Sequence, residues 1–102
     1  MTSIIKNDDT GWISLDSYIS YRRKNGVVFV KAYWSSMSIT TSWVTKATLP
    51  DGYRPSEGVY FPCMSLTTAQ ILGYINTGGA IALRASTGTS SATGFLISYP
   101  IV

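Results

Sequence analysis

Acid–base catalysis in proteins usually relies on histidine or on two carboxylates held close together. This sequence of 102 residues contains no histidine and five carboxylates. Asp51 and Glu57 flank one loop and could approach each other as the carboxylates of a glycosidase do, although solvated turn residues are the simpler interpretation. The serines lack a histidine base, and the G-x-S-x-G motif of hydrolases is absent. The sequence therefore predicts that the protein is not an enzyme and has no catalytic residues.

The single cysteine, Cys63, is the other side chain with distinctive reactivity. One cysteine excludes an intrachain disulfide and a zinc cluster built within one chain. It lies between Pro62 and Met64 and has no histidine as a base, so we expect a small buried apolar side chain. A phosphate-binding loop is not predicted either, because the stretch STGTSSATG lacks the lysine. We therefore expect no metal and no cofactor.

Aromatic side chains are the more promising functional groups, since the chain has three tryptophans and seven tyrosines. Saccharides are held by aromatic rings that stack on the C–H faces of sugars, while polar side chains bond the hydroxyls. Trp43 begins an expected strand after a Ser/Thr-rich stretch, which favours partial exposure. The turn after that strand concentrates polar residues beside an aromatic ring. The candidate saccharide-binding residues are therefore Trp43 and Tyr53 for stacking, and Asp51 and Arg54 for bonding hydroxyls.

Three consecutive cations, Arg22, Arg23 and Lys24, raise the question of nucleic-acid binding. The net charge is +3, but the eight cations are scattered and no run exceeds three, whereas phosphate binding needs several clustered cations. Asn25-Gly26 is a strong signal for a two-residue type I′ hairpin turn. Alternation along the hairpin then sends the cations to both faces. We expect solvated hairpin residues in preference to an anion-binding patch, and no nucleic-acid partner.

The same turn sets the pairing of the hairpin, with Lys24 opposite Val27 and Arg22 opposite Phe29. One face of the hairpin is then almost wholly apolar and should be buried, with Trp34 among its members: Ile19, Tyr21, Val28, Val30, Ala32 and Trp34. The other face mixes aromatic side chains with cations: Tyr18, Ser20, Arg22, Lys24, Phe29, Lys31 and Tyr33. This second face is either a contact with another subunit or an exposed aromatic platform.

Short β-rich runs alternate with turn residues along the whole chain, and no convincing helix occurs. Residues 50–52 and 76–79 have the Pro, Asp, Asn and Gly residues of turns. The stretch 35–42 predicts a loop or a short edge strand, and the stretch 86–93 predicts a flexible loop. Strands are expected over 12–15, 18–24, 27–34, 43–49, 59–64, 70–76, 80–85 and 95–99.

This pattern predicts an all-β fold, a small antiparallel β-sandwich or barrel of jelly-roll type. Residues 1–10 are expected to form a linker or arm, and residues 11–102 a single domain. Hydrophobic residues make up 45% of the chain and charged residues only 13%, so we expect a partner chain or another domain to cover part of the surface. No run of 18 apolar residues occurs, and membrane insertion is not predicted.

Five motifs occur in an order that resembles a known family: TGWISL, YRRKNGVVFVKAY, TLPDGYRPS, VYFP and LISYP. The chain from residue 11 to residue 102 is similar to the C-terminal head domain of siphophage tail-fibre and baseplate receptor-binding proteins and minor structural proteins. The resemblance is to heads from phages of Gram-positive hosts, and it implies a trimeric β-barrel head that binds host cell-wall saccharide. In that family LPDGYRPS looks like a structural turn, so no binding residue is transferred from it.

Two functions follow from this resemblance. The first is a receptor-binding head at the tail tip or baseplate of the virion, which recognises host cell-surface saccharide as a homotrimer and contacts other phage tail proteins. The alternative is a structural virion module that trimerises or docks a tail fibre without binding the host. An exposed tryptophan beside a carboxylate would favour the first, and burial of all aromatic side chains in a trimer would favour the second.

Overall fold

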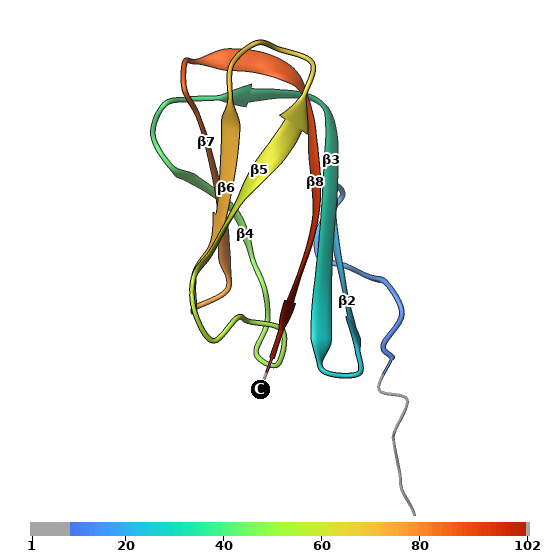
Figure 1. Cartoon of the computed structure of the whole chain (residues 1–102). Helices are drawn as coiled ribbons and strands as arrows, with labels where there is room; N and C mark the ends of the chain where they lie inside the picture. Colours follow the sequence, from blue (N-terminus) through green and yellow to red (C-terminus); the bar gives the residue numbers. More distant parts are fainter. Residues whose placement is uncertain (1–8, 102) are drawn as a thin grey trace, which may run out of the picture.

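Eight β-strands, each antiparallel to its neighbours, make up the fold in the computed structural model, which describes residues 9–101 (Figure 1). Within that range the chain forms no helix. The strands follow the order β1-β2-β3-β8-β5-β6-β7-β4 across a single sheet. Their bounds are β1 Ile13–Ser14, β2 Ile19–Lys24, β3 Val27–Ile39, β4 Val44–Thr48, β5 Val59–Ser65, β6 Ile71–Ile75, β7 Ala80–Ala85 and β8 Thr89–Pro100.

The sheet curls so that its two halves face each other, with β2, β3 and β8 on one side and β4 to β7 on the other (Figure 1). The joint between the halves is narrow, because β5 pairs with β8 only at Met64–Gly94 and Ser65–Thr93. Apolar side chains fill the space between the halves as one core. The predicted all-β antiparallel fold is confirmed, in the form of one curled sheet that makes a half-barrel. Trimer formation stays a prediction.

The β2–β3 hairpin has the turn and the register that its sequence predicts. Asn25 and Gly26 both adopt positive φ, at 52° and 79°, as a type I′ turn requires. Lys24 pairs with Val27, and Arg22 pairs with Phe29. All six residues of the predicted apolar face are buried: Ile19, Tyr21, Val28, Val30, Ala32 and Trp34.

Of the two Ser/Thr-rich stretches, residues 35–42 agree with their prediction of a loop or short edge strand, and residues 86–93 differ from theirs. β3 continues to Ile39, and β8 begins at Thr89 and pairs with it, after a register shift between Trp34 and Met37. The prediction of a flexible loop over 86–93 is therefore wrong from residue 89 onward. Residues 35–39 extend β3 with a partner on one side only, since β2 pairs no further than Ala32. Burial of Met37, Ile39 and Thr93 stabilises this pairing, which the low hydrophobicity of both stretches conceals.

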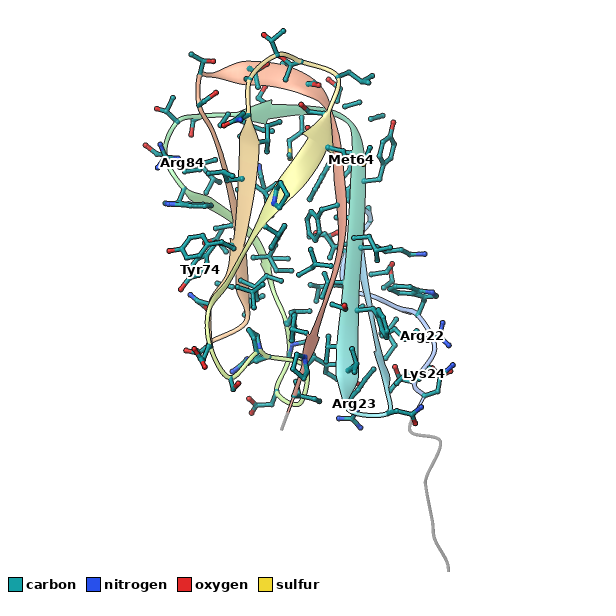
Figure 2. The ribbon with its side chains drawn as sticks, in the orientation of Figure 1. Arg22, Arg23, Lys24, Met64, Tyr74 and Arg84 are labelled. Carbon is teal, nitrogen blue, oxygen red and sulfur yellow. The ribbon has the colours of Figure 1, made fainter. Side chains whose placement is uncertain are left out.

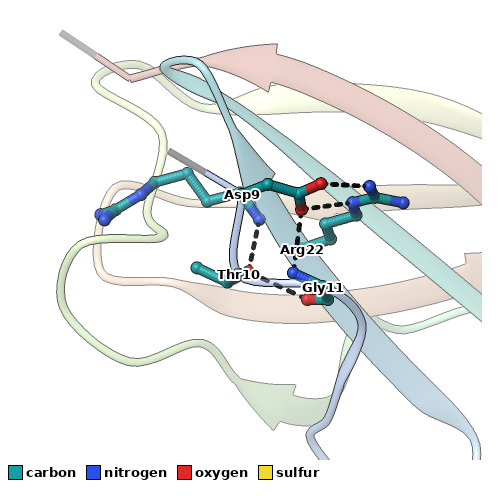
Figure 3. Close-up of polar contacts among 5 residues, drawn as sticks. Asp9, Thr10, Gly11 and Arg22 are labelled. Atoms are coloured by element: carbon teal, nitrogen blue, oxygen red, sulfur yellow. Dashed lines mark hydrogen bonds and ion pairs between the residues drawn. The ribbon is translucent and has the colours of Figure 1, made fainter. Parts of the chain in front are cut away.

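An acidic side chain clasps the start of the domain to the hairpin (Figure 3). The Asp9 carboxylate accepts hydrogen bonds from Nε and Nη2 of Arg22, at 2.9 and 2.5 Å, and from the Gly11 N–H at 2.9 Å. Thr10 exchanges hydrogen bonds with the backbone of Arg23. Residues 9 and 10 of the expected arm are thus bonded to β2, while residues 1–8 lie outside the described residues.

These bonds lower the pKa of Asp9 from 3.8 to about 2, first through the hydrogen bond from Arg22 and then through the Gly11 N–H. Because the pKa is lower in the folded state, the clasp stabilises the fold above pH 3.8 and this contribution disappears as the pH falls through about 2. We expect an NMR titration of the Asp9 carboxyl carbon to have its midpoint near 2, and Arg22→Gln to raise it toward 3.8. An unchanged midpoint in that variant would show that Arg22 does not hold the carboxylate.

Gly73 is required by the packing of the core. A Cβ at this position would lie 2.1 Å from the ring of Phe61, which crosses β6 at this point. We therefore expect Gly73→Ala to lower the free energy of unfolding by about 1–3 kcal/mol, the usual cost of an overpacked core. Gly88 is the matched control, because a Cβ there has nothing closer than the Ile39 carbonyl oxygen at 4.0 Å. Urea denaturation of both variants checks this, and equal stability of the two would contradict it.

Candidate functional site

The four residues predicted from the sequence to bind saccharide do not form one cluster. Trp43 directly precedes β4, whereas Asp51, Tyr53 and Arg54 follow its other end. A strand of five residues spans roughly 16 Å. The structure therefore brings three of the four residues together and leaves the tryptophan at the far end of β4.

Tyr53 contributes its ring to the closure of one end of the half-barrel. Its ring packs edge-on against buried Tyr21, with centroids 4.6 Å apart. The Tyr99 hydroxyl donates a hydrogen bond to the Tyr53 carbonyl oxygen. Burial raises the pKa of Tyr99, so this hydroxyl keeps its proton and remains a donor. The half-buried ring of Tyr53 is thus engaged with the core and with β8.

Arg54 supports the same loop from inside. Its Nε donates to the Leu49 carbonyl oxygen at 2.8 Å, and its Nη1 lies 3.1 Å from the carboxylate of Asp51. The Asp51 side chain is 96% exposed. These contacts agree with a structural role for the stretch LPDGYRPS. Saccharide binding by Asp51, Tyr53 and Arg54 stays a prediction.

Trp43 instead belongs to a group of three aromatic rings and one arginine on the outer face of β5, β6 and β7, of which Trp43 and Tyr60 are exposed. We call this group, Trp43, Tyr60, Tyr74 and Arg84, the aromatic shelf. The rings of Tyr60 and Tyr74 are stacked, with centroids 4.3 Å apart and planes 23° apart. The Trp43 ring lies 6.0 Å from Tyr74 and 6.2 Å from Tyr60. Figure 2 shows Tyr74 and Arg84 on the same outer side of the molecule.

Strand register explains how the shelf forms. Tyr60 on β5 lies directly opposite Tyr74 on β6, and Tyr74 lies opposite Ala82 on β7. The small Ala82 side chain leaves room for Trp43 to reach the tyrosines. The pairing of β4 with β7 also places Trp43 next to Arg84, whose guanidinium carbon lies 5.7 Å from the centre of the indole ring.

The shelf is open to solvent although its members contact one another. Trp43 is 41% exposed and Tyr60 is 69% exposed. Tyr74 covers one face of the Tyr60 ring, so the exposed area of that ring includes its other face. Gly58 lies against the Tyr74 hydroxyl, where a Cβ would approach to 2.6 Å. The partial exposure expected for Trp43 is confirmed.

A second surface is an apolar groove of about 540 Å³ at the narrow joint between the two halves. It forms where β5 leaves β8 after two paired residues. Its floor is β8, and none of the side chains that line it is charged. Four of them are strongly exposed: Tyr33 at 62%, Met64 at 80%, Leu66 at 88% and Leu96 at 68%.

A smaller hollow of about 280 Å³ continues from Leu96 across the outer face of the hairpin. It is lined by Trp12, Phe29 and two cations of the hairpin. The Lys31 ammonium lies 4.2 Å from the centre of the Trp12 ring, at the distance of a cation–π contact. This mixed face is exposed in the single chain, so both sequence-based interpretations, subunit contact and aromatic platform, remain open.

Sequence reasoning found Trp43 but missed Tyr60, Tyr74 and Arg84. Tyr60 and Tyr74 alternate along their strands with the inward residues Phe61, Gly73 and Ile75. This alternation is the signal in the sequence that indicates that both tyrosines face outward. Their stacking also requires the β5–β6 register, and the connection between these strands, residues 66–70, has no turn signature that would set it.

The described residues offer little reactive chemistry. They hold no group of three or more His, Cys, Asp or Glu side chains that could bind a metal ion. Burial raises the pKa of Cys63 to about 12, so the thiol stays protonated near neutral pH and is a poor nucleophile. Among residues 9–101 there is also no helix that could span a membrane. The arrangement is one of surfaces suited to binding.

Comparisons with known proteins add no family assignment. No protein-family model matches this chain, and a search of curated proteins finds no match.

Proposed function

We propose that this protein is the receptor-binding head of a phage tail fibre or baseplate, which binds host cell-surface saccharide as a homotrimer. It would lie at the tail tip of the virion and contact other tail proteins. The aromatic shelf is the observation that carries the proposal. The order of the motifs from TGWISL to LISYP supports the phage context.

The shelf has the features that a sugar requires. The open face of Tyr60 offers an aromatic surface for the C–H face of a sugar ring. The centre of the Trp43 ring lies 6.2 Å from the centre of the Tyr60 ring. The indole N–H and the tyrosine hydroxyls are polar groups at the rim of an apolar surface, which is the usual composition of a small-ligand site. The four side chains come from three paired strands and from the residue before β4, so a rigid sheet positions them.

The groove supports assembly of several copies. Exposed apolar patches in soluble proteins mark interaction surfaces, and this one has no charge that would repel an identical copy. The groove and the shelf share no residue. Contact between copies through the groove would therefore leave the shelf open to a sugar.

The groove also favours the second candidate function, a structural virion module. Within residues 9–101, Met64 and Leu66 are the most exposed large apolar side chains, at 80% and 88%, and docking of a fibre through them needs no saccharide. The two functions differ in whether the shelf binds a ligand.

Saccharide binding through the shelf predicts that Trp43→Ala and Tyr60→Ala each weaken binding about tenfold, or ~1.4 kcal/mol, because each removes a stacking surface. The measurement is calorimetric titration with cell-wall polysaccharide from Gram-positive hosts. Tyr60 is 69% exposed, so its variant should fold normally, which circular dichroism checks.

Asp51→Ala tests the rival site in the end loop, since this carboxylate is a candidate saccharide-binding residue outside the shelf and is 96% exposed. If the shelf is the site, the affinity of this variant should not change. Loss of binding in Asp51→Ala with normal binding in both shelf variants would place the site in the end loop and overturn the shelf. If the folded protein binds none of the polysaccharides, the result would favour the structural module.

Assembly through the groove predicts that Leu66→Asp and Leu96→Asp shift the protein from trimer to monomer in sedimentation velocity, because each places a charge in the apolar contact. Thr77→Asp is the control, since Thr77 is exposed in the β6–β7 turn outside the groove. A wild-type protein that sediments as a monomer at micromolar concentration would refute the trimer.

A further inference from the structure

Arg84 differs from the other three arginines because, within residues 9–101, its guanidinium has no hydrogen-bond acceptor and no ion-pair partner. The others each bond to a carboxylate or a backbone carbonyl: Arg22 to Asp9, Arg23 to Gly52, and Arg54 to Asp51 and Leu49. The centre of the Trp43 ring lies 5.7 Å from the guanidinium carbon and orients Arg84. This cation–π contact leaves the N–H donors of Arg84 able to bond an oxygen acceptor.

The half of the sheet around Arg84 carries positive charge only. Strands β4 to β7 contain Lys46 and Arg84 and no aspartate or glutamate. The next carboxylates along the chain are Asp51, which already pairs with Arg54, and Glu57. Such a distribution on the four strands attracts anions.

Two of the hydrogen-bonding groups of the shelf can act only as donors, which also favours a ligand rich in acceptors. The guanidinium and the indole N–H can only donate, while the hydroxyls of Tyr60 and Tyr74 can donate or accept. Sugar hydroxyl oxygens can accept from these donors, but an anionic oxygen makes a shorter and stronger bond to a guanidinium. Carboxylate and phosphate oxygens match the planar guanidinium fork in a two-bond geometry, which makes arginine the preferred residue for them.

We infer that the shelf binds an anionic saccharide, with Arg84 pairing to a carboxylate or phosphate on the sugar while the sugar ring lies on Tyr60 beside Trp43. The inference rests on the proposed function and specifies its ligand class. The anionic group and the stacked ring are then held by neighbouring side chains, because Trp43 contacts both Arg84 and Tyr60.

The test uses one cell-wall polysaccharide that the protein binds, in three forms: native, with its carboxyl groups chemically reduced to alcohols, and with its phosphate groups removed. Calorimetry should show that one of the two treatments weakens binding at least about tenfold, and which one does so identifies the anion as carboxylate or phosphate. Binding of the native form should also weaken as salt rises, since the ion pair is exposed.

Arg84→Gln should lower affinity for the native polysaccharide about tenfold and have no effect on the treated form that lost the anion. Arg84→Lys should retain part of the affinity, because it keeps the charge and loses the fork. The matched control is Lys31→Gln, which removes a cation held over Trp12 on the other half of the molecule and should bind normally.

The outcomes separate this inference from the proposed function. Suppose that the protein binds the native and both treated polysaccharides equally, and that Arg84→Gln binds like the wild type. This result would overturn the anionic ligand but leave saccharide binding by the shelf intact. A larger loss in Lys31→Gln than in Arg84→Gln would move the anion to the hairpin face and overturn the role of Arg84. Folded protein that binds no polysaccharide in native form would overturn both.

Discussion

The side chains packed between the two halves of the sheet hold the molecule together, because few backbone groups join the halves. Within residues 9–101, β5 and β8 form two residue pairs, and backbone hydrogen bonds run from Leu66 to Ala92 and from Ala85 to Thr40. Phe61 from β5 and Phe95 from β8 meet in this core with ring centroids 4.7 Å apart. Phe61 also lies over Gly73, the one residue type that leaves room for its ring on β6. This contact joins the two halves within the core.

The aromatic shelf and the groove follow from the inward position of Phe61 on β5. Side chains alternate along a strand, so the inward position of Phe61 makes Tyr60 and Pro62 face outward, and Met64 with them. Tyr60 then joins the aromatic shelf, while Pro62 and Met64 line the groove. One strand therefore contributes to both surfaces through the register that its buried phenylalanine imposes.

Local signals made the hairpin predictable, and the lack of them made the shelf unpredictable. Asn25-Gly26 determines a pairing that involves only nearby residues, so the register and the burial of Trp34 followed from the sequence. The full length of β8 arises from pairing with β3, a distant strand, and composition alone suggested a loop. The position of Tyr53 in a turn predicts a ring open to a ligand, and nothing local reveals that this ring also packs on Tyr21.

Both ends of the described chain attach near the same hairpin turn. Asp9 bridges to Lys24, and the Ile101 N–H donates to the Gly26 carbonyl oxygen at 2.9 Å. A domain whose ends meet can be placed inside a surface loop of another protein without distortion of either fold. The aromatic shelf does not include this turn, so such a graft would carry the shelf, exposed and intact, onto an unrelated scaffold.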